Sequence, residues 1–144
     1  MAVSVTGKVI LDTNVFIDYL RLGAHSEWVH GRSGRLVRFL SSVVLMELRV
    51  GADTVRRRRA VDAIKIAFPP SRRIAPTAEL YDRAGAVFRK LYGNAPDLAD
   101  RLAPMNDVLI ALTAWRAGAT LVTGNVRELQ RIARQLSGLR VTAP

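Results

Sequence analysis

The chain has 144 residues, of which 49% are hydrophobic and 24% charged, a composition that fits one folded domain and argues against disorder. Its 22 basic residues outnumber 12 acidic ones, and 19 of the 22 are arginine, which favours a nucleic-acid partner unless the genome itself is arginine-biased. Cysteine is absent, which excludes disulfides and thiol catalysis, and no apolar stretch is long enough for a signal peptide or a membrane span, so we expect a cytoplasmic protein.

The first half of the chain predicts strands that alternate with helices. Apolar runs flanked by capping residues, glycine or proline mark the elements; Asp12 and Ser41 precede two of the helices, and Gly51 and Pro69 follow two. In chain order we expect a strand at 8–11, a helix at 15–20, a loop at 24–34, a strand at 36–40, and helices at 43–50 and 54–68.

The second half continues the alternation. We expect a short strand at 73–75, a helix at 77–92, a loop at 94–104, a helix from 105 or 106 to 117, a strand at 120–123, a helix at 126–136 and a last strand at 139–141. Strands that alternate with helices favour an α/β sandwich around a mainly parallel sheet, here as one domain over residues 1–144.

Two acidic residues occupy unusual positions in the first half. Asp12 directly follows the apolar strand, at the carboxyl edge of the sheet where α/β proteins bind ligands, although an aspartate there can also cap a helix. Glu47 lies in the otherwise apolar helix 43–50, where an unpaired carboxylate is costly. Arg49 is a poor partner, because residues two apart do not face each other on a helix. We therefore interpret Glu47 as functional.

Two further sites lie in the second half. Asp107 opens the apolar helix that follows the loop, and it could act there as a functional acid or as a helix cap. Asn125 and Glu128 follow the strand at 120–123, so they can reach the same sheet edge as Asp12 or form a capping box with each other.

A convergence of these acids would have a chemical consequence. Several carboxylates of like charge repel one another unless a cation lies between them. Oxygen ligands without histidine or cysteine suit Mg²⁺ or Mn²⁺, which activate water for phosphodiester hydrolysis. A basic chain with such an acidic site fits a nuclease.

Four segments together resemble the PIN-domain family, and within it the VapC toxin ribonucleases of toxin–antitoxin pairs: Val9–Val15, Ser41–Leu48, Asn106–Ala111 and Leu121–Asn125. The segments have the order and spacing of that family, and the resemblance covers nearly the whole chain. The resemblance implies a three-layer α/β/α sandwich, often a homodimer, that cleaves RNA with Mg²⁺ or Mn²⁺. It also implies a cognate antitoxin that blocks the acidic site.

The resemblance also assigns roles to residues. Asp12, Glu47 and Asp107 match the family's three core acids, which are catalytic and bind the metal. Asn125 stands where an aspartate is common and Glu128 lies nearby, so either residue could complete the metal site. Thr13, Asn14 and Thr123 would then orient these ligands or contact substrate phosphates.

Other features are open to more than one interpretation. Four consecutive arginines cover a helical turn and predict either a solvated face or a contact with RNA or an antitoxin. These arginines are Arg56, Arg57, Arg58 and Arg59. Trp28 could stack on RNA.

Two alternative functions compete with the nuclease. Asn125 motivates a catalytically weak RNA-binding module, because an amide in place of a carboxylate brings no charge to the metal. A phosphotransfer protein is disfavoured, because Asn14 occupies the position at which a dehalogenase-type phosphatase needs a second aspartate.

Overall fold

One parallel sheet organises the protein, in a computed structural model that describes residues 7–31, 35–93 and 98–144. The strands run in the order β3–β2–β1–β4–β5, and every pairing between them is parallel. Their bounds are β1 (Gly7–Leu11), β2 (Leu36–Ser41), β3 (Arg73–Ile74), β4 (Thr120–Val122) and β5 (Val141–Thr142). The chain builds outward from β1 to β3 and then returns to β4 on the other side of β1. The expected α/β fold is confirmed.

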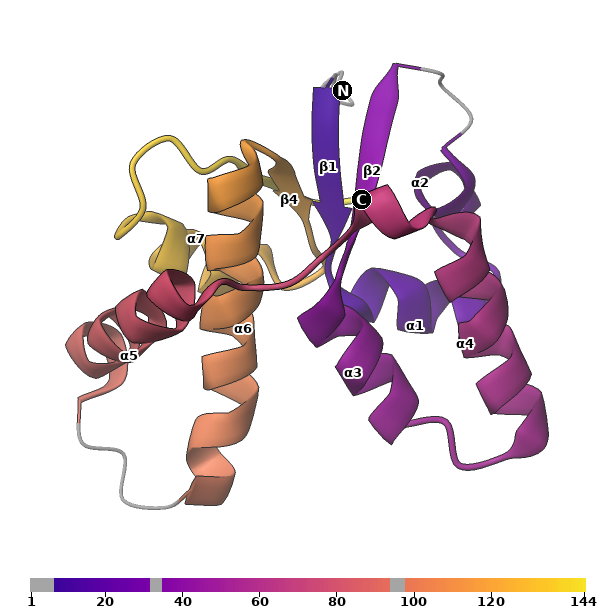
Figure 1. The fold of residues 1–144 in the computed structure, drawn as a ribbon, viewed down its shortest axis with the longest axis horizontal. Coiled ribbons are helices and arrows are strands. Elements are labelled where there is room, and N and C mark those ends of the chain that lie inside the picture. The colour runs from indigo at the N-terminus through magenta and orange to yellow at the C-terminus, as the bar shows by residue number, and fades with distance from the viewer. Residues whose placement is uncertain (1–6, 32–34, 94–97) are drawn as a thin grey trace.

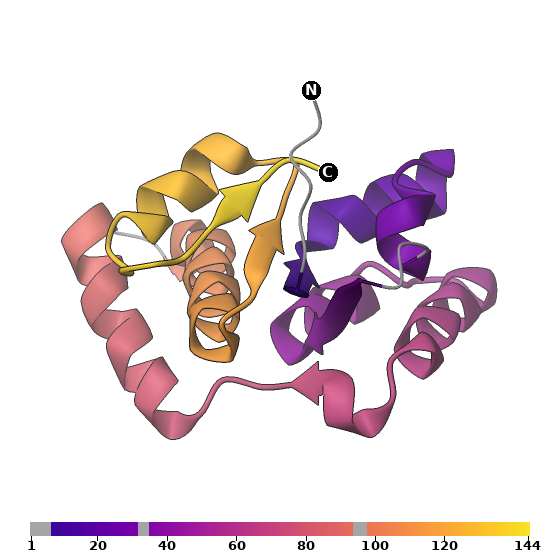
Figure 2. The ribbon, with the colours of Figure 1, turned by 90° about the horizontal axis from the view of Figure 1, so that it is seen from above.

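The helices form two groups on either side of this sheet. Their bounds are α1 (Thr13–Leu22), α2 (Ser26–His30), α3 (Ser42–Val50), α4 (Val55–Ala67), the 3₁₀ turn η1 (Pro70–Arg72), α5 (Ala78–Tyr92), α6 (Leu98–Ala117) and α7 (Val126–Ala133). Figures 1 and 2 show α1 to α4 together on one side and α5 to α7 on the other. Helices α3 and α6 come together across the sheet edge. The three-layer arrangement follows from the two directions in which the chain leaves β1.

Residues with no exposed surface lie in both β1 and α6. Val9 and Ile10 of β1 have no exposed surface, and neither do Val108 and Ile110 of α6. Such a core fixes the backbone positions of the polar residues at its border, which include Asp107. In the part of the chain that the structure describes, no helix is long and apolar enough to cross a membrane.

The structure corrects two expected loops. The segment 24–34 contains the short helix α2, whose Val29 is buried and whose Trp28 packs against the core. Helix α6 begins at Leu98 rather than near residue 105, and Pro104 lies inside it. The proline removes one helical hydrogen bond, to the carbonyl of Asp100. Asp100 is exposed, so water can replace that bond.

The C-terminal boundaries also shift. Helix α7 ends at Ala133 rather than at residue 136, because the amides of Gln135 and Leu136 bond to carbonyls three residues back and tighten the last turn. The last strand is Val141–Thr142, slightly later than expected. Segments 32–34 and 94–97, which belong to expected loops, lie outside the described residues.

Helix α3 depends on a buried cap. Ser41 has no exposed surface, and its Oγ accepts hydrogen bonds from the amides of Val43 (3.2 Å) and Val44 (3.5 Å). We expect Ser41→Ala to lower the free energy of unfolding by about 1–2 kcal/mol, because these amides lose their acceptor. Urea denaturation measures this loss. Ser42→Ala, at the exposed first residue of the same helix, is the control; equal losses in the two variants would contradict this role of Ser41.

Candidate metal centre at the sheet edge

The site begins where two neighbouring strands end. Asp12 follows β1 and Thr123 follows β4, and the chain leaves these strands in opposite directions across the sheet. The amide of Asp12 donates to the carbonyl of Val122 (2.8 Å), and the Thr123 hydroxyl donates to Asp12 Oδ2 (2.8 Å). This is the switch point at which open α/β sheets bind ligands.

Neutral donors hold the carboxylate of Asp12. The amide of Thr13 donates to Oδ1 (2.8 Å), so Asp12 also caps α1. The side-chain amide of Asn14 donates to Oδ2 (3.2 Å) and to the Thr123 hydroxyl (3.2 Å), and its carbonyl oxygen accepts from the amide of Gly124 (2.8 Å). Burial raises the pKa of Asp12, while the hydrogen bonds from Thr123, Thr13 and Asn14 act in the opposite direction.

Glu47 is also held by neutral groups. The Thr13 hydroxyl donates to Glu47 Oε1 (2.6 Å), and the Asn106 side-chain amide lies 3.4 Å from Oε2. Helices α1 and α6 therefore both contact this residue of α3. Arg49 pairs with Asp62 of α4 (2.5 Å), so Arg49 and Glu47 do not form the pair that the sequence argued against.

Asp107 has the most perturbed carboxyl group of the site. Burial and, next, the charges of Asp12, Glu47 and Glu128 raise the pKa of Asp107 to about 7. Asp107 therefore interacts with the charges of the other three carboxylates. Among the described residues, no arginine or lysine forms an ion pair with Asp12, Glu47 or Asp107.

The residues of α7 differ from a capping box. Asn125 is the N-cap, but its side chain makes no capping hydrogen bond. Glu128 accepts a hydrogen bond from the Tyr92 hydroxyl and lies 3.6 Å from Nη1 of Arg131. From the sequence, the helical spacing of Tyr92 favours a core or dimer-interface position and Arg131 does not stand out, because nothing in their spacing connects the end of α5 with α7.

This donor set fits a hard divalent cation. Every ligand atom of Asp12, Glu47 and Asp107 is an oxygen, and no ion pair with a described arginine or lysine balances their mutual repulsion. Within residues 7–31, 35–93 and 98–144, however, no three acidic or histidine side chains are already close enough to hold an ion. A bound ion would therefore have to draw these side chains together.

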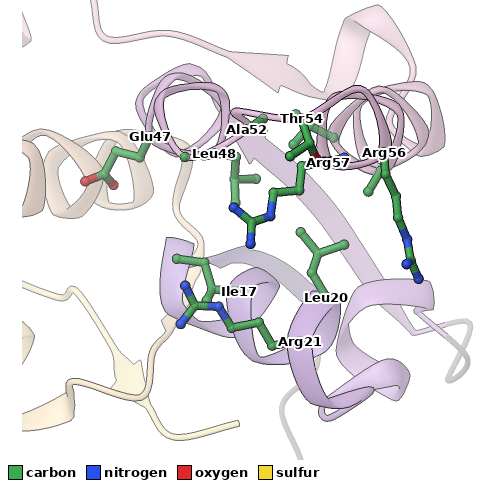
Figure 3. A pocket seen from close by; sticks show the side chains of 12 residues that line it. Ile17, Leu20, Arg21, Glu47, Leu48, Ala52, Thr54, Arg56 and Arg57 are labelled. Atoms are coloured by element: carbon green, nitrogen blue, oxygen red, sulfur yellow. Dashed lines mark hydrogen bonds between the residues drawn. The ribbon is translucent and has the colours of Figure 1, made fainter.

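A groove of about 530 Å³ adjoins the acidic site between α1, α3 and α4. Apolar side chains form most of it: Ile17, Leu20, Leu48, Ala52, Ala60 and Val61. Arg21, Arg56 and Arg57 also line it, and Figure 3 shows Glu47 at one end with its carboxylate pointing away from these arginines. The groove thus combines an apolar surface and positive charge with one acid of the site.

The four consecutive arginines that the sequence singled out do not act as one set. All of them are exposed on α4: Arg56, Arg57, Arg58 and Arg59. Arg57 pairs with Asp53 (2.6 Å), and the backbone carbonyl of Arg58 accepts a hydrogen bond from Nη1 of Arg49 (3.3 Å). Arg56 and Arg57 line the groove, whereas Arg58 and Arg59 are not among its lining residues. The helical turn therefore divides the run, and a partner in the groove would meet only the first two arginines.

Trp28 is the other weaker prediction from the sequence. It is half-buried in α2, which lies among the helices on the opposite side of the sheet from α6 and α7 (Figure 1). The RNA or antitoxin contacts that the sequence predicted for Trp28 and for the four arginines of α4 remain predictions.

The PIN domain family profile matches residues 9–135. The chain belongs to the PIN domain family. A search of curated proteins finds no match. Solved structures of the same fold include VapBC2 from Rickettsia felis bound to a promoter DNA fragment (22% identity, TM-score 0.65, 95% of this chain and 98% of that one). DNA-bound VapBC from Salmonella typhimurium is similar too (24% identity, TM-score 0.63, 94% and 97%). So is VapBC-1 from nontypeable Haemophilus influenzae (24% identity, TM-score 0.61, 93% and 96%).

The pKa of Asp107 predicts how the stability of this PIN domain depends on pH. Since folding raises that pKa from 3.8 to about 7, the folded state binds the proton more tightly. Asp107 is therefore least costly to the fold below pH 4, and its cost grows as the pH rises through about 7. Without divalent ions, we expect Asp107→Asn to raise the melting temperature at pH 8 and to change it little at pH 4.

Thermal melting across this pH range measures the difference between variant and wild type. Asp82→Asn, at an exposed position of α5, is the control. A stability gain by Asp107→Asn that is the same at pH 4 and pH 8 would show that the gain does not come from loss of the charge.

Proposed function

We propose that the protein is a metal-dependent endoribonuclease of the VapC toxin type, neutralised by a cognate antitoxin. The observation that carries the proposal is a group of carboxylates at the switch point of a PIN domain, in which neutral donors hold Asp12 and Glu47 and no described arginine or lysine pairs with Asp12, Glu47 or Asp107. Membership of a family whose domains are generally nucleases supports the reaction. The excess of arginine supports a nucleic-acid substrate.

Asp12, Glu47 and Asp107 would hold Mg²⁺ or Mn²⁺. When bound, the ion supplies an activated water and stabilises the charge that develops on the phosphate. The chain's own residues fix the geometry: Thr13 donates to both Asp12 and Glu47, and Thr123 orients Asp12. Arginines at the surface would bind flanking phosphates and so position the RNA without reading its sequence.

The partners are part of the proposal. The similar VapBC structures contain a toxin with its antitoxin, which supports an antitoxin partner for this chain. We propose that an antitoxin segment lies in the groove beside Glu47, with apolar side chains against Leu48 and Val61 and acidic ones beside Arg21 and Arg57. A homodimer that acts in the cytoplasm completes the proposed biological unit.

We expect the purified protein to cleave RNA only with Mg²⁺ or Mn²⁺. Asp12→Asn and Asp107→Asn should each lower the rate by more than the roughly 100-fold that loss of an outer partner of a metal site can cost. Gel assays with single-stranded RNA, and with DNA of the same sequence, measure cleavage. Asp82→Asn, an exposed acid of α5, is the control and should cut like wild type.

The outcomes separate the candidate functions. Equal cleavage by wild type and both site variants would show that the site lies elsewhere. Cleavage of DNA but not of RNA would overturn the substrate. Binding of RNA without cleavage at any metal concentration would instead indicate the RNA-binding module.

The groove gives a separate prediction about the antitoxin. The probe is the antitoxin that we expect a small neighbouring reading frame to encode. Arg21→Glu should weaken its binding about tenfold or more, because an attractive contact between charges becomes repulsive. Arg89→Glu, an exposed charge reversal on α5, is the control. Calorimetric titration measures both constants, and unchanged affinity with Arg21→Glu would place the antitoxin on another surface.

A further inference from the structure

A second set of contacts joins α5 to α7 beside the acidic site. The Tyr92 hydroxyl, at the end of α5, donates to Oε1 of Glu128. Arg131, one turn further along α7, places Nη1 3.6 Å from the same oxygen. A hydrogen-bond donor from α5 and a cationic group of α7 thus converge on one oxygen of Glu128.

Arg131 is itself fixed by α5. Its guanidinium lies over the Tyr92 ring, 5.0 Å from the ring centroid, and its Nη2 donates to the carbonyl of Leu91 (2.7 Å). The Tyr92 ring also packs on Phe88 of the same helix, with 5.0 Å between the ring centroids. Because Tyr92 and Arg131 hold each other as well as Glu128, the three residues form one unit, which we name the α5–α7 latch.

The latch interacts with the acidic site through the charge of Glu128, which acts on Asp107. Glu128 is one of three carboxylates that raise the pKa of Asp107, and Asp107 in turn contributes to the raised pKa of Tyr92. Burial and Glu128 contribute more to that rise, so Tyr92 keeps its proton and remains a donor. Glu128 is thus both near Asp107 and tied to a neighbouring helix.

We propose that Tyr92 and Arg131 are positioning residues that hold Glu128 beside Asp107 as an outer carboxylate of the metal site, not as a direct ligand. This inference rests on the proposed metal site. Direct ligation through Oε1 would compete with the phenol for this oxygen and would bring the cation against the guanidinium of Arg131. With the latch intact, Glu128 instead attracts the cation through its charge and can bind water of its hydration shell with Oε2.

The first experiment measures Mn²⁺ binding to the metal-free full-length protein by calorimetry, without RNA. Tyr92→Phe keeps the ring and removes the donor, and it should raise the dissociation constant about tenfold, as does loss of an outer partner at other metal sites. Tyr81→Phe makes the same change on the exposed face of α5 and should bind Mn²⁺ like wild type. Wild-type affinity in Tyr92→Phe overturns the latch.

A double variant tests whether Tyr92 acts through Glu128. Glu128→Gln alone should weaken Mn²⁺ binding, and adding Tyr92→Phe should weaken it by no more than about twofold further, because the residue that Tyr92 positions has lost its charge. Two independent effects that multiply would overturn the proposal. The melting temperatures of all variants without metal show whether a loss of affinity merely follows a loss of folding.

Arg131→Gln distinguishes two effects of Arg131 on metal binding: its positioning of Glu128 and its own positive charge. Removal of a positive charge near a cation site should by itself tighten Mn²⁺ binding. The latch predicts the opposite, weaker binding, because Tyr92 and Glu128 lose the group that fixes them. Tighter binding by Arg131→Gln would overturn the positioning role, even if Tyr92→Phe failed to fold.

These experiments distinguish a failure of the latch from a failure of the proposed function. A wild-type protein that binds Mn²⁺ but cuts no RNA would refute the nuclease and still allow the latch to be tested. A wild-type protein that does not bind Mn²⁺ would refute the metal site itself. Normal wild-type binding and cleavage, with Tyr92→Phe unchanged, would refute only the latch.

Discussion

The hydrogen bond from Thr123 to Asp12 joins the two strands on which the rest of the site depends. It connects the ends of β1 and β4, where the chain changes direction across the sheet, and it fixes an acid that has almost no exposed surface. Asn14 reinforces this bond with donors to both partners. The three residues that precede Asp12 are buried, so the orientation of Asp12 is determined by packing as well as by hydrogen bonds.

Because these donors are uncharged, the carboxylates keep their negative charge, and the site can bind a cation. A chain with 19 arginines has many residues that could pair with the acids, yet in the described ranges Asp12, Glu47 and Asp107 are held by hydroxyls, amides or burial alone. An arginine would balance their charge and occupy the space of an ion. A hydroxyl or amide fixes the direction of a carboxylate while its charge stays uncompensated. The positive charge of the chain therefore lies outside the acidic site, where a polyanion would meet it.

Much of the fold and the choice of acids followed from the sequence, because both rest on local patterns. The apolar runs before Asp12 and around Glu47 predicted a strand and a helix, and the same runs made these acids conspicuous. The predicted start of α6 was wrong, because a proline usually ends a helix, whereas here Pro104 lies inside the helix and Asp100, whose carbonyl it leaves without a partner amide, is an exposed residue. The contacts of Tyr92, Arg131 and Asn106 could not be predicted, since they join helices that are far apart in the chain.

Glu128 differs from the other three acids in its pairing with an arginine, and this difference indicates its role. It is the one acid near the site, within the described residues, that has an arginine, and that arginine is held by α5 rather than free to move. A carboxylate that is partly neutralised attracts a cation less strongly, so it suits an outer position where it can shape the field without competing for coordination. The sequence did not decide whether Asn125 or Glu128 completes the metal site. It shows which residues carry oxygen atoms but not which of these atoms already form hydrogen bonds or ion pairs. The ion pair with Arg131 sets Glu128 apart from Asp12, Glu47 and Asp107, and we propose that these three acids form the inner set that holds the ion.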